Sequence, residues 1–172
     1  MPHLIKGGLV GDDRWTLVRD GEASLPSSPT IVPLATWFAK RDELRNRNDI
    51  GVWLAPADDP ALLAGDAATL PLIAVDFPKF ADGRGYSIAR LLRERFLFKG
   101  ELRAVGDVAR DQLYYLHQVG FDAFLLRDGK DAQDALASLR DFTDGYQATN
   151  RRTPWFRRSD TDVPLRHRGA TE

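Results

Sequence analysis

Apolar and polar positions follow two rhythms along residues 30–146. Short apolar runs of four to six residues, rich in valine, isoleucine and leucine, have the length and composition of buried β-strands. After each run, apolar residues recur every three or four positions, as they do on one face of an amphipathic helix. The expected strands span residues 30–34, 50–55, 72–77, 102–105 and 121–126, and an expected helix follows each of them.

About five such units predict an α/β fold with a mainly parallel sheet, because an intervening helix lets successive strands run in the same direction. One strand departs from the pattern, since Glu101, Arg103 and Val105 share one of its sides. An arginine in mid-strand needs a charged partner beneath a helix, so this side lines a polar cavity, as in a barrel, or the strand lies near an edge. Because five units cannot close an eight-stranded barrel, we expect an open doubly wound sheet first and a partial or dimer-completed TIM-like barrel second.

The two ends of the chain lack this rhythm. Residues 3–10 and 14–18 are short apolar runs around glycine-containing turns, which predicts a small β-hairpin. We therefore divide the chain into an N-terminal hairpin arm and linker at 1–29, an α/β domain at 30–146, and a basic tail at 147–172. The tail is expected to be disordered or loosely docked, because no periodicity survives in it.

The composition excludes several classes of protein. The 172-residue chain has no cysteine, so it forms no disulfide and supplies no thiol nucleophile or iron–sulfur ligand. No apolar run approaches the ~20 residues that span a bilayer, and the N-terminus lacks the apolar core of a signal peptide. We therefore expect a cytoplasmic protein that does not enter a membrane.

The net charge of −1 is unevenly distributed. Residues 151–172 carry six arginines against three acidic residues, so the rest of the chain is acidic. An acidic body argues against nucleic-acid binding, whereas a basic tail suits contact with an acidic partner.

Candidate chemistry is concentrated in the charged, glycine-containing loop that leads from Pro78 into the helix expected at about 86–96. Free N–H groups and the helix dipole favour an anion at a helix N-terminus, and glycine lets the backbone approach it closely. A tight turn capped by Asp82 or Ser87, with solvated cations around it, is the alternative. The residues expected to hold sulfate, sulfite, phosphate or a carboxylate are Lys79, Asp82, Gly83, Arg84, Gly85, Tyr86, Ser87 and Arg90.

The fourth expected strand and the turn after it bring further charges to the same candidate site. These charges either brace the two loops through ion pairs or complete a clamp around an anionic ligand. The residues concerned are Arg103, Asp107, Arg110 and Asp111.

Acidic residues also end several expected strands, and carboxylates at neighbouring strand ends can bind magnesium. They are Asp76, Asp107 and Asp128, with Asp58 a weaker candidate. Asp58 and Asp107 also stand in the ordinary position of helix caps. We therefore predict no metal site.

Two long motifs carry a resemblance to a known family. They read D-F-P-K-F-A-D-G-R-G-Y-S-I-A-R-L-L-R-E-R at residues 76–95 and G-E-L-R-A-V-G-D-V-A-R-D-Q at residues 100–112. Together with G-F-D-A-F at residues 120–124, they resemble a bacterial family of uncharacterised proteins whose members are often labelled oxidoreductases of sulfite reduction. The similarity extends from about residue 4 into the last expected helix.

The resemblance implies a role in assimilatory sulfate reduction, because genes of the family commonly accompany those for sulfite reductase and phosphoadenylyl-sulfate reductase. It implies no catalytic residue. Many members have cysteine where this chain has Val119, so no thiol mechanism carries over. The positions that match the motifs include Asp76, Lys79, Asp82, Arg84, Tyr86, Arg90, Arg103, Asp107, Arg110, Asp111 and Gln112.

Two functional hypotheses follow. The first is a non-catalytic accessory protein of sulfate and sulfite reduction that binds a sulfur oxyanion, or binds sulfite reductase or another enzyme of that pathway. The alternative is a nicotinamide- or flavin-dependent oxidoreductase, or a lyase, that acts at the C-terminal strand ends on a small anionic substrate. Its acid or base would be Lys79, Tyr86 or Asp107. A homodimer is a third, structural possibility, and without a nucleotide-binding glycine fingerprint the sequence identifies no cofactor.

Overall fold

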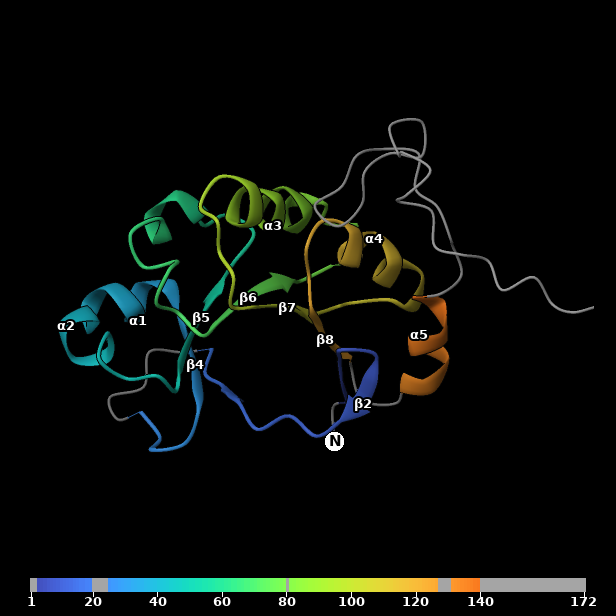
Figure 1. The fold of residues 1–172 in the computed structure, drawn as a ribbon, viewed down its shortest axis with the longest axis horizontal. Helices are drawn as coiled ribbons and strands as arrows, with labels where there is room; N and C mark the ends of the chain where they lie inside the picture. The colour runs from blue at the N-terminus through green and yellow to red at the C-terminus, as the bar shows by residue number, and fades with distance from the viewer. Residues whose placement is uncertain (1–2, 20–24, 80, 127–130, 140–172) are drawn as a thin grey trace, which may run out of the picture.

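The computed structural model describes residues 3–19, 25–79, 81–126 and 131–139, which form one mixed sheet with helices packed against it (Figure 1). The sheet has eight strands in the order β2-β1-β8-β7-β6-β5-β4-β3. The strands are β1 (His3–Lys6), β2 (Leu9–Gly11), β3 (Thr16–Leu17), β4 (Thr30–Pro33), β5 (Ile50–Leu54), β6 (Leu72–Phe77), β7 (Glu101–Gly106) and β8 (Ala123–Leu126). All five strands expected within residues 30–126 are therefore present.

The helical segments after β4, β5 and β7 are shorter than the apolar pattern predicts, whereas the helix after β6 has the expected length. The stripe after residue 60 yields only a four-residue 3₁₀ turn, whereas Asp131 opens the last helix as expected by accepting hydrogen bonds from Gln133 and Asp134 N–H. No helix in the described ranges is both long and apolar enough to cross a membrane. The helical elements are α1 (Leu34–Ala39), α2 (Arg41–Leu44), η1 (Pro60–Leu63), α3 (Arg84–Glu94), η2 (Arg110–Gln112), α4 (Leu113–Gln118) and α5 (Ala132–Ser138).

The strand order corrects the expected architecture. Strands β3 to β8 pair in parallel and follow one another in chain order, while β1 pairs antiparallel with both β2 and β8. A doubly wound sheet reverses its strand order at a switch point, and this sheet does not, so the first expectation was wrong. The mixed sheet curls into a half-barrel, which corresponds to the partial barrel named second.

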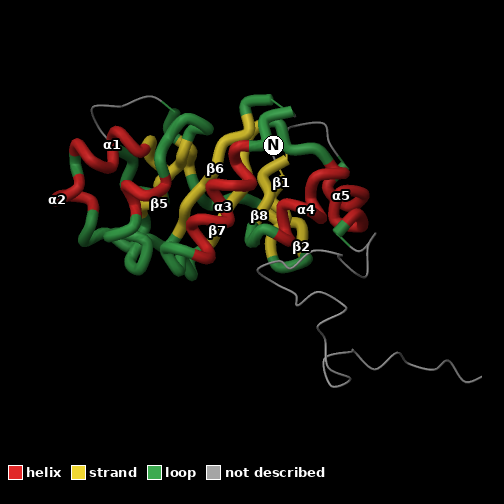
Figure 2. Tube along the Cα trace, turned by 90° about the horizontal axis from the view of Figure 1, so that it is seen from above, coloured by secondary structure: helices red, strands yellow, loops and turns green. Residues whose placement is uncertain are grey.

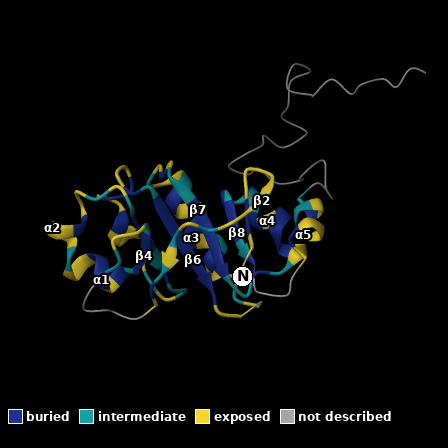
Figure 3. Ribbon diagram, turned by 90° about the horizontal axis from the view of Figure 1, so that it is seen from below, coloured by how far each residue is buried: buried dark blue, intermediate teal, exposed yellow. Residues whose placement is uncertain are grey.

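The helices cover one face of the sheet, as Figure 2 shows from above. Alternate residues of β6 divide between the two faces: Ile73, Val75 and Phe77 pack with helical side chains, whereas Leu72 and Ala74 belong to a second cluster. This second cluster contains no helical residue, so it marks the opposite face, which carries no helix in the described part of the chain and which we call the helix-free face. In Figure 3 the central strand β6 is buried along its length, and β7 is buried except at its two end residues.

Residues 12–15 cross the helix-free face and lead into edge strand β3; we call residues 12–19, from this crossing to Arg19, the strap. Its first four residues join edge strand β2 to edge strand β3 at the other side of the sheet (Figure 1, blue). Eight flat strands would place these edges about 34 Å apart, whereas the connection reaches at most about 18 Å. The sheet must therefore curl until its edges come within reach of the strap.

A buried arginine fastens the strap to the centre of the sheet. Arg103 is 1% exposed; its Nη1 donates to Asp13 Oδ2 (2.6 Å) and its Nε donates to Glu101 Oε1 (2.7 Å). Lys6 Nζ donates to the other Glu101 oxygen at 2.6 Å. Because β7 lies between β6 and β8, Arg103 does not lie at a sheet edge, and the charged partners it was expected to need lie on the helix-free face.

We expect Asp13→Asn to lower the free energy of unfolding by about 3 kcal/mol, because removing one partner leaves the buried Arg103 charge incompletely compensated. Urea denaturation followed by circular dichroism measures this loss. Asp12→Asn is the matched control: its side chain is exposed and forms no ion pair in the described part of the chain. A loss as large in the control as in Asp13→Asn would contradict the role given to the strap.

Candidate functional site

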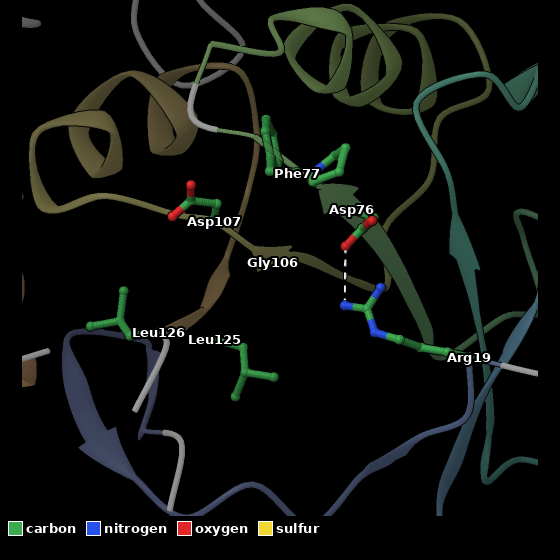
Figure 4. A pocket seen from close by; sticks show the side chains of 8 residues that line it. Arg19, Asp76, Phe77, Gly106, Asp107, Leu125 and Leu126 are labelled. Carbon is green, nitrogen blue, oxygen red and sulfur yellow. Dashed lines mark hydrogen bonds and ion pairs between the residues drawn. The ribbon is translucent and has the colours of Figure 1, made fainter. Parts of the chain in front are cut away.

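A pocket of about 440 Å³ opens at the carboxyl ends of β6, β7 and β8 (Figure 4). Parallel strands commonly hold ligands at these ends, because the turns that leave them carry polar groups on a rigid base. The lining residues are Arg19, Asp76, Phe77, Pro78, Gly106, Asp107, Leu125 and Leu126.

Asp76 and Arg19 form the charged centre of the pocket. Asp76 lies near the end of β6 and is only 7% exposed. Arg19 Nη2 donates to Asp76 Oδ1 at 3.2 Å, and Figure 4 shows the two side chains pointing toward each other. The guanidinium also lies 5.7 Å from the centre of the Trp53 ring, whose Nε1 donates to Val18 O at 2.8 Å. The strap thus carries Arg19 to the pocket, and Trp53 holds that end of it in place.

Gly106 lets the end of β7 lie directly against the end of β6. Its φ angle of +98° lies in the left-handed region that favours glycine. A Cβ atom there would stand 2.5 Å from Phe77 O and 2.9 Å from Asp76 Oδ1. Asp107 N–H donates to Phe77 O at 2.6 Å immediately afterwards. The turn therefore requires a residue without a side chain at position 106, and it sets the position of Asp107 on the pocket wall.

The N-terminus of α3, the centre of the predicted anion site, is occupied by the protein's own carboxylate. Arg84 donates to both oxygens of Asp82, from Nε at 2.9 Å and from Nη2 at 2.7 Å, and Arg84 N–H donates to Oδ1 at 3.2 Å. These hydrogen bonds hold the pKa of Asp82 below its usual value. The anion favoured at this helix end is thus supplied by Asp82, and Arg84 is already paired.

The other predicted cations also lie outside the pocket. Arg90 pairs with Glu94 one turn along α3 at 3.0 Å, and Arg110 pairs with Asp134 at 2.8 Å. Arg103 is enclosed by its carboxylate partners on the helix-free face. The remaining polar residues predicted to bind the anion are exposed; they are Lys79, Ser87 and Asp111.

Gly85 and Tyr86 pack against Phe77 of β6. The Tyr86 ring meets the Phe77 ring edge-on, with centroids 5.8 Å apart, and the Phe77 ring fills the space that a Cβ at Gly85 would need. Burial and, to a lesser degree, the Asp111 charge raise the pKa of Tyr86. Its phenol therefore stays protonated at neutral pH, and these two residues fix the start of α3 on the sheet.

Among the predicted anion-binding residues, Asp107 lines the pocket, together with Asp76 from the set of strand-end acids. Asp107 does not cap the next helix, because η2 begins after Ala109. Asp58 accepts from Ala55 N–H at 2.7 Å, and Asp128 lies outside the described residues. Within the described ranges, no three His, Cys, Asp or Glu side chains gather as they would around a metal ion.

Sequence reasoning missed Arg19, Leu125 and Leu126. Arg19 lies 57 positions from its partner Asp76, in a segment interpreted as part of a separate arm. Nothing near Arg19 in the sequence marks it as a ligand-binding residue. For Asp76 a signal did exist, because it is the one charge at the end of a continuous apolar run.

A family model described as "Bacterial protein of unknown function (DUF934)" matches residues 51–156, which is more than half of the chain. The match includes every pocket residue except Arg19. Among curated proteins and among solved structures, no significant match to the chain is found.

Gly106→Ala is expected to lower the free energy of unfolding by at least about 2 kcal/mol, since a left-handed φ alone costs a non-glycine residue about 1–2 kcal/mol and the Cβ also meets the Phe77 carbonyl oxygen. Thermal and urea denaturation measure the loss. Gly83→Ala is the control, because a Cβ there meets nothing within 4 Å and its φ is −79°. Equal stability of the two variants would show that the β7 turn tolerates a side chain.

Arg84→Met is expected to raise the pKa of Asp82 toward its ordinary value, because the variant removes the guanidinium hydrogen bonds that most favour the charged carboxylate, although the backbone N–H of residue 84 still donates to it. A carboxyl whose pKa is lowered by folding adds stability above its unfolded pKa, and loses it as the pH falls through its folded pKa. The wild type should therefore lose this contribution on the acid side, and the variant should lack it. Carbon NMR titration of the Asp82 carboxyl measures the pKa, and Arg90→Met should leave it unchanged.

Proposed function

The chain belongs to the bacterial family of unknown function that matches residues 51–156, and on that premise we propose that it binds a small, oxyanion-bearing ligand in the pocket at the ends of β6, β7 and β8. The protein acts as an accessory protein of sulfate and sulfite reduction. The observation that carries the proposal is the Arg19 guanidinium, which presents hydrogen-bond donors to a pocket of ligand size.

Arg19 has the capacity to hold an oxyanion. Its side chain is 53% exposed, and its hydrogen bonding within the described chain consists of the single 3.2 Å contact with Asp76. A guanidinium has five N–H donors in a planar fork that matches the oxygens of a carboxylate or of a sulfur oxyanion. Leu125 and Leu126 supply an apolar wall, so an anion bound there would be partly shielded from water.

The pathway comes from the family resemblance carried by the motifs at residues 76–95 and 100–112. Asp76, Phe77 and Pro78 of the first motif, and Gly106 and Asp107 of the second, line the pocket. The same resemblance makes sulfite reductase, or another enzyme of sulfate assimilation, the partner that the accessory protein serves.

An enzyme is the second candidate, and the position of Asp107 favours it. Asp107 lies on the pocket wall, where a carboxylate at the end of a parallel strand can act as a general acid or base. Lys79 and Tyr86, the other residues considered for that role, are not among the residues lining this pocket. A reductase of this kind would need a nicotinamide or flavin, and the absorbance spectrum of the purified protein tests for the flavin.

Calorimetric titration of the full chain with sulfite and with sulfate tests the proposal. We expect Arg19→Gln to weaken binding of the preferred oxyanion about tenfold or more, because a charge-assisted hydrogen bond contributes about 1.5–3 kcal/mol. Arg84→Gln is the matched control, since its guanidinium is paired with Asp82 outside the pocket. Binding that Arg19→Gln leaves intact would move the oxyanion site elsewhere, and no binding of either anion would contradict an inorganic sulfur ligand.

A further inference from the structure

The Asp76 carboxylate has acceptor capacity directed at the pocket. The residue is 7% exposed, and its side chain accepts one hydrogen bond in the described part of the chain, the 3.2 Å contact from Arg19. Neither of its oxygens is among the described side-chain atoms that are buried without a partner, so the second oxygen reaches the solvent of the pocket. A carboxylate can accept several hydrogen bonds, so a ligand in the pocket can supply a further donor to Asp76.

The Arg19 guanidinium, in contrast, has N–H donors that can bind further acceptors. The guanidinium contacts the Asp76 carboxylate through Nη2 and lies over the Trp53 ring, and the side chain is 53% exposed, so it has further N–H donors to offer a ligand. The pocket therefore offers acceptor capacity at Asp76 and donor capacity at Arg19, side by side (Figure 4).

A ligand with one sign of charge satisfies only half of this pair. A plain anion beside Arg19 also comes close to the Asp76 carboxylate, which repels it. A plain cation beside Asp76 meets the same difficulty with Arg19. A ligand with both charges avoids the repulsion, because each of its groups faces its opposite.

We propose that the ligand is a small zwitterion, with an ammonium group and an oxyanion group on a short carbon chain, as in an α-amino acid or an aminosulfonate. The oxyanion binds Arg19 and the ammonium group donates to Asp76. This inference rests on the proposed function, since it names the ligand class of the same pocket.

The rest of the pocket suits such a molecule. Its volume of about 440 Å³ has room for a few carbon atoms besides the two charged groups. The Leu125 and Leu126 side chains and Pro78 give the carbon chain an apolar surface. Asp107 faces the pocket from the side opposite Arg19 in Figure 4, where its negative charge also favours the ammonium end.

The test is a calorimetric panel on the full chain at neutral pH. The zwitterions are L-serine, L-cysteine and taurine, the anions are propionate and sulfite, and the cation is ethylamine. We expect at least one zwitterion to bind about tenfold or more tightly than every singly charged probe, since it makes charge-assisted hydrogen bonds to both side chains. Taurine against the two amino acids distinguishes a sulfonate from a carboxylate.

Asp76→Asn separates the two halves of the site. It should weaken the preferred zwitterion about tenfold or more while leaving propionate and sulfite binding unchanged or tighter, because it removes only the negative charge. Arg19→Gln should weaken zwitterions and anions together. Asp82→Asn, outside the pocket, is the control and should change neither.

The outcomes distinguish this inference from the proposed function. If sulfite binds through Arg19 and no zwitterion binds more tightly, the zwitterion assignment is overturned and the oxyanion site stands. If no probe binds, both are overturned. Retained anion binding in Asp76→Asn shows that the variant is folded, so a selective loss of zwitterion binding supports the assignment.

Discussion

The reach of the connection between β2 and β3 sets the shape of this protein. These strands lie at opposite edges of the sheet, yet only residues 12–15 separate them in the chain. The sheet curls so that its edges approach, and the strap then crosses the helix-free face. Two of its charged residues meet partners there, Asp13 with Arg103 and Arg19 with Asp76. The pair of Asp13 and Arg103 fastens the strap to the centre of the sheet, and the pair of Arg19 and Asp76 lines the pocket at the strand ends.

The ion pairs of the structure divide by the distance between their partners along the chain. Asp82 pairs with Arg84 two residues later at the start of α3, and Arg90 pairs with Glu94 one turn along that helix. Such exposed pairs contribute little to stability and leave little capacity for a ligand. The pair of Arg19 and Asp76 joins distant segments, has one hydrogen bond, and lines a hollow. A cluster of charged residues in the sequence therefore indicates the site less well than the pairing of each charged side chain in the structure.

The sequence was sufficient to predict the strands within residues 30–126, because continuous apolar runs have few alternatives to burial in a sheet. It also indicated that Arg103 needed charged partners. Strand order and the position of the site depend on contacts between distant residues. Asp13 lies 90 positions from Arg103, so the strap could not be inferred from local pattern. Local sequence could not distinguish an anion site at the start of α3 from an ordinary turn. Asp82 stands where a helix commonly begins, and its carboxylate also neutralises Arg84.

The pairing of β1 with β8 has a consequence for the order in which the molecule is built. His3, which is synthesised long before Leu126, lies opposite it in the finished sheet. Strands β4 to β7 can join as they emerge, because each adds to the one made just before it. The β1–β2 hairpin must wait for β8. A nascent chain that has not yet reached β8 therefore exposes unpaired strand edges at both β1 and the last strand made, which are the places where a chaperone, or a second nascent chain, would attach.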